Sequence, residues 1–180
     1  MERLVGSEMC IRDRDKPVYW CPDCNSALAE AEVEYKDKTS TSIDFLFEME
    51  TSSVNEIFNT SVDEKIKTSF LSWTTTPWTI PGNVALSVNP NLDYSLLEVN
   101  KDNSMQCLII CKDLIDSVLE RCSISDFTIL STKPGSILES AEAKHPYFDR
   151  KSTVILGDHV TTEMGTGIVH TAPALSLIHI

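Results

Sequence analysis

Alternation of apolar and polar positions predicts short strands along most of the chain. The alternation is clear in residues 29–35 and again in residues 43–49, where the apolar side chains fall on one face, as in a half-buried strand. Further apolar segments bounded by turn residues predict strands at residues 66–74, 84–88, 94–99, 105–111, 127–130, 154–156 and 168–171. Residues 50–64 are polar and weakly patterned, which predicts a surface segment.

Helical spacing is clear only in residues 113–122, where Leu114, Ile115, Val118 and Leu119 share one face. Many short strands with few helices favour a closed or nearly closed β-barrel over a doubly wound sheet. We therefore expect a mainly β fold with one or a few short helices.

Composition and charge narrow the class of protein. The chain has 180 residues, 42% of them hydrophobic, which suits one ordinary core. Its formal net charge of -12 repels phosphate at long range, so a nucleic-acid partner must be held largely by other means. Six unevenly spaced cysteines fit a reducing compartment, and no apolar run reaches the ~18 residues of a membrane helix. We expect a soluble, cytoplasmic protein with no membrane partner.

The two ends differ in character from the rest. Residues 1–14 show no sustained period, and residues 174–180 follow a different segment without a turn; both resemble translated adaptor sequence. The native portion is therefore expected to run from about Asp15 to about Pro173, as a piece of a longer protein.

Cys21 and Cys24 form a C-x-x-C turn, whose spacing lets two thiolates face one ion. Structural zinc takes four such ligands, so the pair predicts half a zinc site, with a metal-free turn as the alternative. A redox pair is a further alternative, although the strand pattern that follows does not suit a thioredoxin-like site. Cys107 and Cys111 are expected to be core cysteines.

The segment SWTTTPWTIPGN, residues 72–83, contains no carboxylate, histidine, cysteine or lysine. Threonine and tryptophan favour strands, and the two prolines and Gly82 interrupt them, so composition alone predicts a strand that runs into an irregular loop. By the same reasoning His170 is a strand histidine, His159 belongs to a turn and His145 to a surface loop.

Four segments together resemble the editing insertion of isoleucyl-tRNA synthetases, which are class I aminoacyl-tRNA synthetases. They are KPVYWCPDCNSALAEAEVEY, SWTTTPWTIPGNVALSVNP, CKDLIDSV and ILGDHVTTEMGTGIVHTAP. The valyl and leucyl relatives carry Thr-Thr-Arg-Pro followed by an acid, whereas here Thr76 takes the place of the arginine and Trp78 that of the acid. The resemblance implies a zinc-knuckle half with a connecting strand at residues 15–35 and a barrel-like editing domain at residues 36–173.

The resemblance also implies the site and its reaction, which is hydrolysis of the ester of mischarged Val-tRNA(Ile). Thr74, Thr75 and Thr76 would hold the ester and the attacking water. Trp78 and Thr79 would shape a pocket too small for isoleucine. Other positions implied by the family are Asn83 beyond this loop, His170 over the amino acid, and Cys21 and Cys24 as zinc ligands. The partners would be the 3′ aminoacyl end of tRNA(Ile) and the rest of the synthetase.

Two departures limit what the chain is expected to do alone. The HIGH-type and KMSKS-type signatures are absent, so ATP and Mg²⁺ would belong to the parent enzyme. The family continues after Pro173 into a loop with an aspartate that holds the ammonium group of the substrate, and residues 174–180 replace it. Little or no deacylation is therefore expected from this chain alone. A non-enzymatic β-barrel that binds a partner through its metal knuckle and a small redox protein are the alternative functions.

Overall fold

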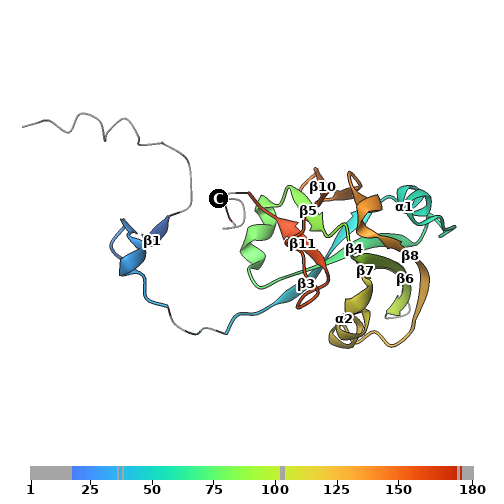
Figure 1. Cartoon of the computed structure of the whole chain (residues 1–180), viewed down its shortest axis with the longest axis horizontal. Coiled ribbons are helices and arrows are strands. Elements are labelled where there is room, and N and C mark those ends of the chain that lie inside the picture. Colours follow the sequence, from blue (N-terminus) through green and yellow to red (C-terminus); the bar gives the residue numbers. More distant parts are fainter. Residues whose placement is uncertain (1–17, 36, 38, 102–103, 174, 176–180) are drawn as a thin grey trace, which may run out of the picture. The chain divides into compact units, whose positions relative to one another are not determined.

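The computed structural model describes residues 18–35, 37, 39–101, 104–173 and 175, which fall into two compact units (Figure 1). Of the described residues, the smaller unit contains residues 18–35, 37 and 175, and the larger unit lies within Thr39–Pro173. The predicted adaptor-like ends, residues 1–14 and, apart from Leu175, residues 174–180, lie outside the described residues.

The smaller unit contains a two-stranded antiparallel hairpin, in which β1 (Tyr19–Cys21) pairs with β2 (Ser26–Leu28) around the C-x-x-C turn. The strand predicted for residues 29–35 is wrong, because Glu30–Glu32 form the short 3₁₀ helix η2. The Glu32 carboxylate accepts the backbone N–H of Ala29 at 2.7 Å, and this local bond closes the turn. The alternating Ala and Glu residues are therefore part of a local turn, not of a sheet.

The larger unit contains two sheets, and the first has five strands in the order β3-β4-β7-β6-β8. Its strands are β3 (Ile43–Met49), β4 (Lys67–Thr74), β6 (Asp93–Lys101), β7 (Ser104–Cys111) and β8 (Phe127–Pro134). The β4–β7 pair is parallel and the other pairs are antiparallel. This sheet carries the predicted strand at residues 43–49 with its predicted bounds.

The second sheet has four strands in the order β11-β5-β10-β9. Its strands are β5 (Ala85–Val88), β9 (Glu142–Lys144), β10 (Lys151–Leu156) and β11 (Ile168–Thr171). Strands β5 and β10 run parallel, while β11 and β9 pair antiparallel with their neighbours. The short 3₁₀ helix η5 (Gly135–Leu138) links β8 to β9.

The edges of the second sheet pack on the first, with β11 against β4 and β9 against β3. A hydrogen bond of 2.9 Å from Ser72 Oγ to the Ile168 carbonyl joins β4 to β11. Backbone pairing nevertheless closes neither sheet on itself within the described residues. The predicted mainly β fold is confirmed, and the predicted closed barrel is not.

Within the described part of the chain, the larger unit also contains two α helices. Helix α2 (Ile115–Arg121) follows the 3₁₀ turn η4 (Lys112–Leu114) and buries the apolar face expected from its spacing. Helix α1 (Thr51–Phe58) occupies part of the predicted surface segment, residues 50–64, most of which are exposed or half-buried as predicted, but the helix itself was not expected. Ser52, Ser53 and Glu56 are exposed, while Thr51, Val54 and Phe58 are buried. Among the described residues, no helix is long and apolar enough to cross a membrane.

Candidate functional site

The threonine segment begins where β4 ends. The backbone N–H of Thr76 donates to Thr74 Oγ1 at 3.1 Å, which turns the chain out of the sheet. Pro77 then opens the 3₁₀ helix η3 (Pro77–Gly82), so the predicted irregular loop is a short helix with a proline at its start. Within it, the N–H and the hydroxyl of Thr79 both reach the Thr76 carbonyl, at 3.0 and 2.7 Å.

Strand β11 delivers His170 to this helix from 91 residues further along the chain. Gly165 and Gly167, with φ of 85° and 74°, form the turn before the strand. His170 pairs with Leu86 of β5, and its Nε2 lies 2.8 Å from Thr79 Oγ1. Its Nδ1 lies 3.4 Å from Asn83 Nδ2.

The hydrogen-bond partners determine where the proton of His170 resides. Thr79 has one hydroxyl proton, and it is donated to the Thr76 carbonyl, so Thr79 Oγ1 accepts from Nε2–H of His170. Asn83 Nδ2 donates to the Ala85 carbonyl at 2.8 Å and to His170 Nδ1, which must then be the unprotonated nitrogen. Both ring nitrogens are therefore engaged by protein groups.

The surroundings of His170 favour the neutral imidazole. Burial lowers the pKa of His170 below its ordinary value, and the nearby His145 lowers it further. The Phe45 ring meets the imidazole edge-on, with 5.9 Å between ring centroids. His170 therefore acts at this site as an uncharged, hydrogen-bonded group.

Five of the seven predicted editing-site residues are linked by these contacts. They are Thr74, Thr76, Thr79, Asn83 and His170. Thr75 has an exposed side chain, and its carbonyl accepts the Ser40 hydroxyl at 3.0 Å. The Trp78 side chain, 71% exposed, points away from the core.

His145 was predicted to lie in a surface loop, and that prediction is wrong, because its side chain is only 5% exposed. Its Nε2–H donates to the Ile80 carbonyl at 3.0 Å, while Nδ1 accepts the backbone N–H groups of Tyr147 and Phe148. Arg150 Nη2 donates to the Pro81 carbonyl at 2.6 Å. The turn after β9 therefore supports the C-terminal end of η3, a role for which the sequence offers only the His-Pro-aromatic run as a signal.

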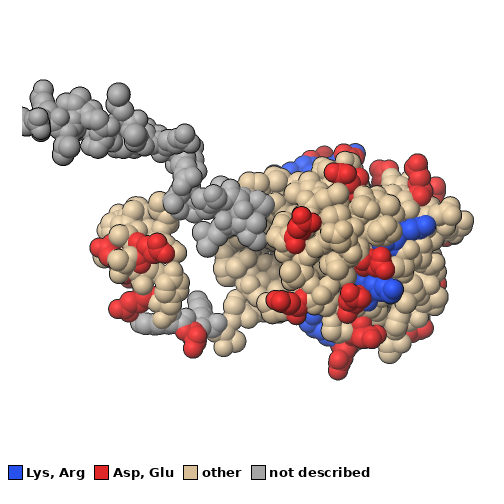
Figure 2. All heavy atoms as spheres, in the orientation of Figure 1, with Lys and Arg blue, Asp and Glu red and all other residues tan. Residues whose placement is uncertain are grey.

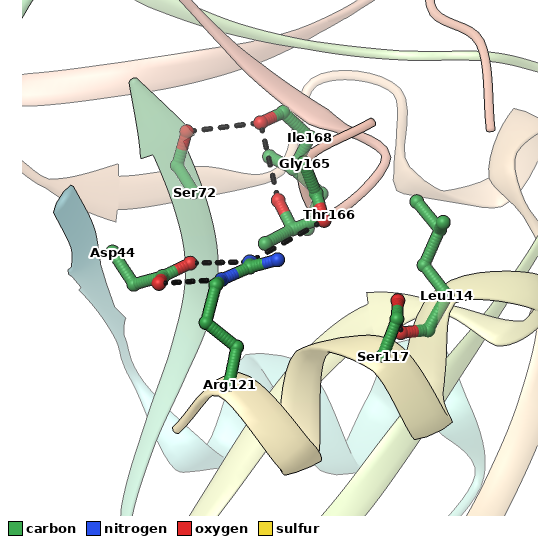
Figure 3. Close-up of polar contacts among 8 residues, drawn as sticks. All are labelled: Asp44, Ser72, Leu114, Ser117, Arg121, Gly165, Thr166 and Ile168. Carbon is green, nitrogen blue, oxygen red and sulfur yellow. Dashed lines mark hydrogen bonds and ion pairs between the residues drawn. The ribbon is translucent and has the colours of Figure 1, made fainter. Parts of the chain in front are cut away.

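A second set of contacts holds the turn that precedes β11 (Figure 3). Arg121 of α2 donates two hydrogen bonds to the Asp44 carboxylate on β3, at 2.9 and 2.6 Å, and its Nη2 lies 3.5 Å from the Gly165 carbonyl. Together with the Ser72 bond to Ile168, these contacts tie the turn to β3, β4 and α2. They fix the start of the strand that presents His170.

Comparison with known proteins identifies the family. The family model of the class I tRNA synthetases (I, L, M and V) matches residues 1–166. The chain belongs to this family. Among curated class I synthetases it is 52% identical over 159 residues to the "Isoleucine--tRNA ligase" of Shewanella sp. (strain W3-18-1), and equally to that of Shewanella putrefaciens. The match covers 88% of this chain but 17% of each relative, so the chain spans about a sixth of their length.

Solved structures of leucyl members of the family share the fold. The crystal structure of GlLeuRS-CP1 superposes with a TM-score of 0.61 at 19% identity, over 74% of this chain and 55% of that one. The cytosolic leucyl-tRNA synthetase editing domain of P. knowlesi gives a TM-score of 0.59 at 18% identity, over 77% and 60%. The chain therefore has the fold of a synthetase editing domain.

The cysteine pair of this synthetase chain lies on the hairpin of the smaller unit. The backbone N–H of Cys24 donates to Cys21 Sγ at 3.4 Å, and this bond lowers the pKa of the Cys21 thiol. Within the described residues, no set of three or more His, Cys, Asp or Glu side chains is arranged to hold a metal. Two thiols are half of the ligand set of a structural zinc site, and the half zinc site stays a prediction.

The other cysteine pair belongs to the core. Cys107 and Cys111 are buried, as predicted, and burial raises the pKa of the Cys107 thiol to about 11. Burial also raises the pKa of Cys111. Neutral thiols are poor metal ligands, so these two cysteines are packing residues.

Acidic side chains are scattered over the face of the larger unit shown in Figure 2, with a few lysines and arginines between them. Several of the cations are paired with carboxylates, including Lys144 with Glu48 and Lys151 with Glu142. This visible face therefore offers no broad basic patch for a nucleic-acid backbone.

Proposed function

We propose that this chain is the editing part of an isoleucine–tRNA ligase and that, within the complete ligase, it hydrolyses the ester of valine mischarged onto tRNA(Ile). The observation that carries the proposal is the hydrogen-bonded link from His170 through Thr79 to Thr76, which joins two distant segments in an editing-domain fold. The relatives that match most of the chain are named as isoleucine–tRNA ligases, which supports the choice of amino acid.

The reaction needs a positioned water rather than a protein nucleophile. An aminoacyl ester is already activated, so water can attack its carbonyl carbon while hydrogen-bond donors stabilise the developing oxyanion. The C–O bond to the terminal ribose then breaks, and the ribose oxygen takes a proton. Thr74, Thr75 and Thr76 would supply the hydroxyl groups nearest the end of β4.

His170 serves in this proposal as a positioning residue. With Nε2–H donated to Thr79 and Nδ1 facing Asn83, neither nitrogen is free to take a proton from water in the conformation described. The ring instead fixes the Thr79 hydroxyl against the Thr76 carbonyl and so sets the shape of the threonine segment.

Selectivity would come from size exclusion at this site. One methylene separates valine from isoleucine and is worth only ~1 to 3 kcal/mol in binding, a limit for which isoleucyl-tRNA synthetases themselves are the standard example. A second site that admits valine and excludes isoleucine overcomes this limit. Trp78 and Thr79 are proposed to bound that site.

The remaining features concern the whole ligase. Cys21 and Cys24 would supply two zinc ligands, with the other ligands elsewhere in the ligase, and ATP and Mg²⁺ would bind at its synthetic site. The partners would be the 3′ end of tRNA(Ile) and the rest of the ligase chain, in the cytoplasm. The two packed sheets of the larger unit would act as a nearly closed barrel around the site.

The proposal is tested by placing residues 18–173 into the Shewanella ligase in place of the matched segment. The hybrid is expected to release valine from Val-tRNA(Ile), and His170→Ala and Thr75→Ala are expected to slow that release by about tenfold or more. If both folded variants release valine as fast as the unmodified hybrid, the threonine segment is not the hydrolytic site. Zinc binding with no hydrolysis by the hybrid would instead favour a binding module.

A further inference from the structure

Ser152 lies at the centre of the second sheet, and the sequence gives no sign of its importance. It belongs to β10, its side chain is fully buried, and its Oγ lies 2.6 Å from Asn83 Oδ1. Asn83 is equally buried. A buried bond this short between two uncharged side chains indicates a defined partner for each.

Strand order explains how Ser152 reaches the site. In the sheet, β5 lies between β10 and β11, so Ser152 and His170 belong to strands that do not pair with each other. Asn83 comes two residues before β5 and bridges the gap, with its oxygen toward Ser152 and its nitrogen toward His170.

The direction of each hydrogen bond follows from one fixed acceptor. The Ala85 carbonyl can only accept, so the Asn83 atom 2.8 Å from it is the NH₂ group, and the opposite atom is the oxygen. Ser152 must then donate to that oxygen. The same NH₂ group faces His170 Nδ1. A proton on Nδ1 would place two donors against each other, so Nδ1 carries no proton.

We propose that Ser152 is a positioning residue that acts through Asn83 to keep the proton of His170 on Nε2, directed at Thr79. The chain of donors runs in one direction, from Ser152 to Asn83, to His170, to Thr79 and finally to the Thr76 carbonyl. Its effect on hydrolysis rests on the proposed function, whereas its effect on the His170 proton does not.

Removal of the Ser152 hydroxyl leaves Asn83 Oδ1 buried without its donor. The amide then gains by turning or shifting to find another donor, which weakens its hold on His170 Nδ1. The Nδ1–H form of the imidazole, excluded in the native chain, becomes accessible. Ser152→Ala should therefore lower the ratio of Nε2–H to Nδ1–H forms by about fivefold, the effect of about one neutral hydrogen bond.

The test is ¹⁵N NMR of the His170 imidazole in this chain, recorded near pH 8, where the ring is neutral. We expect shifts typical of a single Nε2–H form in the native chain, a mixed form in Ser152→Ala, and the native form in Ser152→Thr, which keeps the hydroxyl. Ser95→Ala is the matched control, because Ser95 is also fully buried and hydrogen-bonded, to Thr132 at 2.8 Å, on β6 of the other sheet. It should leave the His170 shifts unchanged.

Native His170 shifts in folded Ser152→Ala would overturn the proposal and leave Ser152 a packing residue. If Ser152→Ala does not fold, the same ¹⁵N measurement is made on Ser152→Cys. Its thiol has a shape similar to the serine hydroxyl but is only a weak donor, so the same outcomes apply. Hydrolysis by the ligase hybrid separates the two proposals. If Ser152→Ala shifts the His170 proton but the hybrid does not hydrolyse Val-tRNA(Ile), only the proposed function is wrong. If the hybrid hydrolyses the ester but Ser152→Ala leaves the His170 proton on Nε2, only the role of Ser152 is wrong.

Discussion

His170 is held by a hydroxyl and an amide rather than by a carboxylate. A carboxylate partner would stabilise the imidazolium and raise the pKa of the histidine, whereas neutral partners and burial do the opposite. The ring is therefore suited to hold Thr79 in place at neutral pH without adding a positive charge.

The Thr79 hydroxyl is expected to contribute to stability as well as to the site. Thr79→Val keeps the branched shape but removes the acceptor for His170 Nε2–H and the donor to the Thr76 carbonyl. We expect the free energy of unfolding to fall by about 1 to 3 kcal/mol, measured by urea denaturation, because a partly buried N–H loses its acceptor.

Thr75→Val is the control for that measurement, since the Thr75 side chain is exposed. It should change the free energy of unfolding by no more than about 0.5 kcal/mol. Equal losses in the two variants would show that the Thr79–His170 bond contributes nothing specific.

The buried histidines predict how stability depends on pH. Burial lowers the pKa of His145 and of His170 in the folded protein, so the unfolded chain binds protons more readily. Their contribution is fully present above the unfolded pKa of about 6.5 and is lost as the pH falls through the lower folded values. Each can add a slope of at most about 1.4 kcal/mol per pH unit to the free energy of unfolding.

His145→Gln should flatten this slope below about pH 6.5, as measured by urea denaturation at several pH values. His159→Gln, at an exposed histidine in a turn, serves as the control. An unchanged slope in His145→Gln would contradict the assignment of a neutral, buried His145.

The residues of the site were predictable to different degrees. Resemblance to the family singled out Thr76, Thr79 and His170, which from composition alone are ordinary strand and loop residues. Ser152 and His145 were missed because their partners, Asn83 and Ile80, lie 69 and 65 positions away in sequence. Such contacts depend on strand order, which no local pattern shows.

At the scale of elements, the site depends on where β11 begins. Gly167 immediately precedes it, with φ of 74°, and its carbonyl accepts the Tyr94 hydroxyl at 2.7 Å. A Cβ atom there would lie 2.3 Å from Cys111 Cβ, so the turn passes too close to β7 for any side chain. Backbone conformation and packing both require glycine at this position.

Gly167→Ala should therefore be among the most damaging single substitutions in the larger unit. Backbone strain of about 1 to 3 kcal/mol adds to an overpacking cost of similar size. Gly165→Ala shares the positive φ, but its nearest contact is 3.3 Å, to the Trp73 ring, so it should cost less. Thermal or urea unfolding compares the two, and an equal or greater loss in Gly165→Ala would contradict the packing argument.

Elements were predictable where a regular period coincided with a sheet partner. Ile43–Met49 alternate and pair along their whole length with β4, so the predicted bounds are correct. Residues 29–35 alternate equally well but fold into a local 3₁₀ turn. Helix α1 was missed because its apolar face is narrow, with Val54 and Phe58 as its main buried side chains.

At the scale of the molecule, the two units of the chain are expected to differ in how far their stability depends on a metal. Two thiolates on the β1–β2 hairpin are half the usual set for structural zinc, and the larger unit has a hydrophobic core of its own. We expect zinc to bind this chain weakly or by bridging two copies, and a chelator to leave the unfolding of the larger unit almost unchanged.

Calorimetric titration with zinc, followed by unfolding with and without a chelator, checks this expectation. Cys24→Ser should abolish the weak binding. Tight binding of one zinc per monomer would contradict it and would mean that further side chains of this chain complete the site.

The central claim is that the segment from Thr74 to Thr79, held by His170, forms a hydrolytic site that accepts valine and excludes isoleucine. The most direct test is the ratio of deacylation rates on Val-tRNA(Ile) and Ile-tRNA(Ile), measured with the Shewanella ligase hybrid that carries residues 18–173. We expect faster release of valine by at least about tenfold, with selectivity reduced in Thr79→Val because that side chain is proposed to bound the site. A folded hybrid that leaves both esters intact, or cleaves both at the same rate, would contradict the claim.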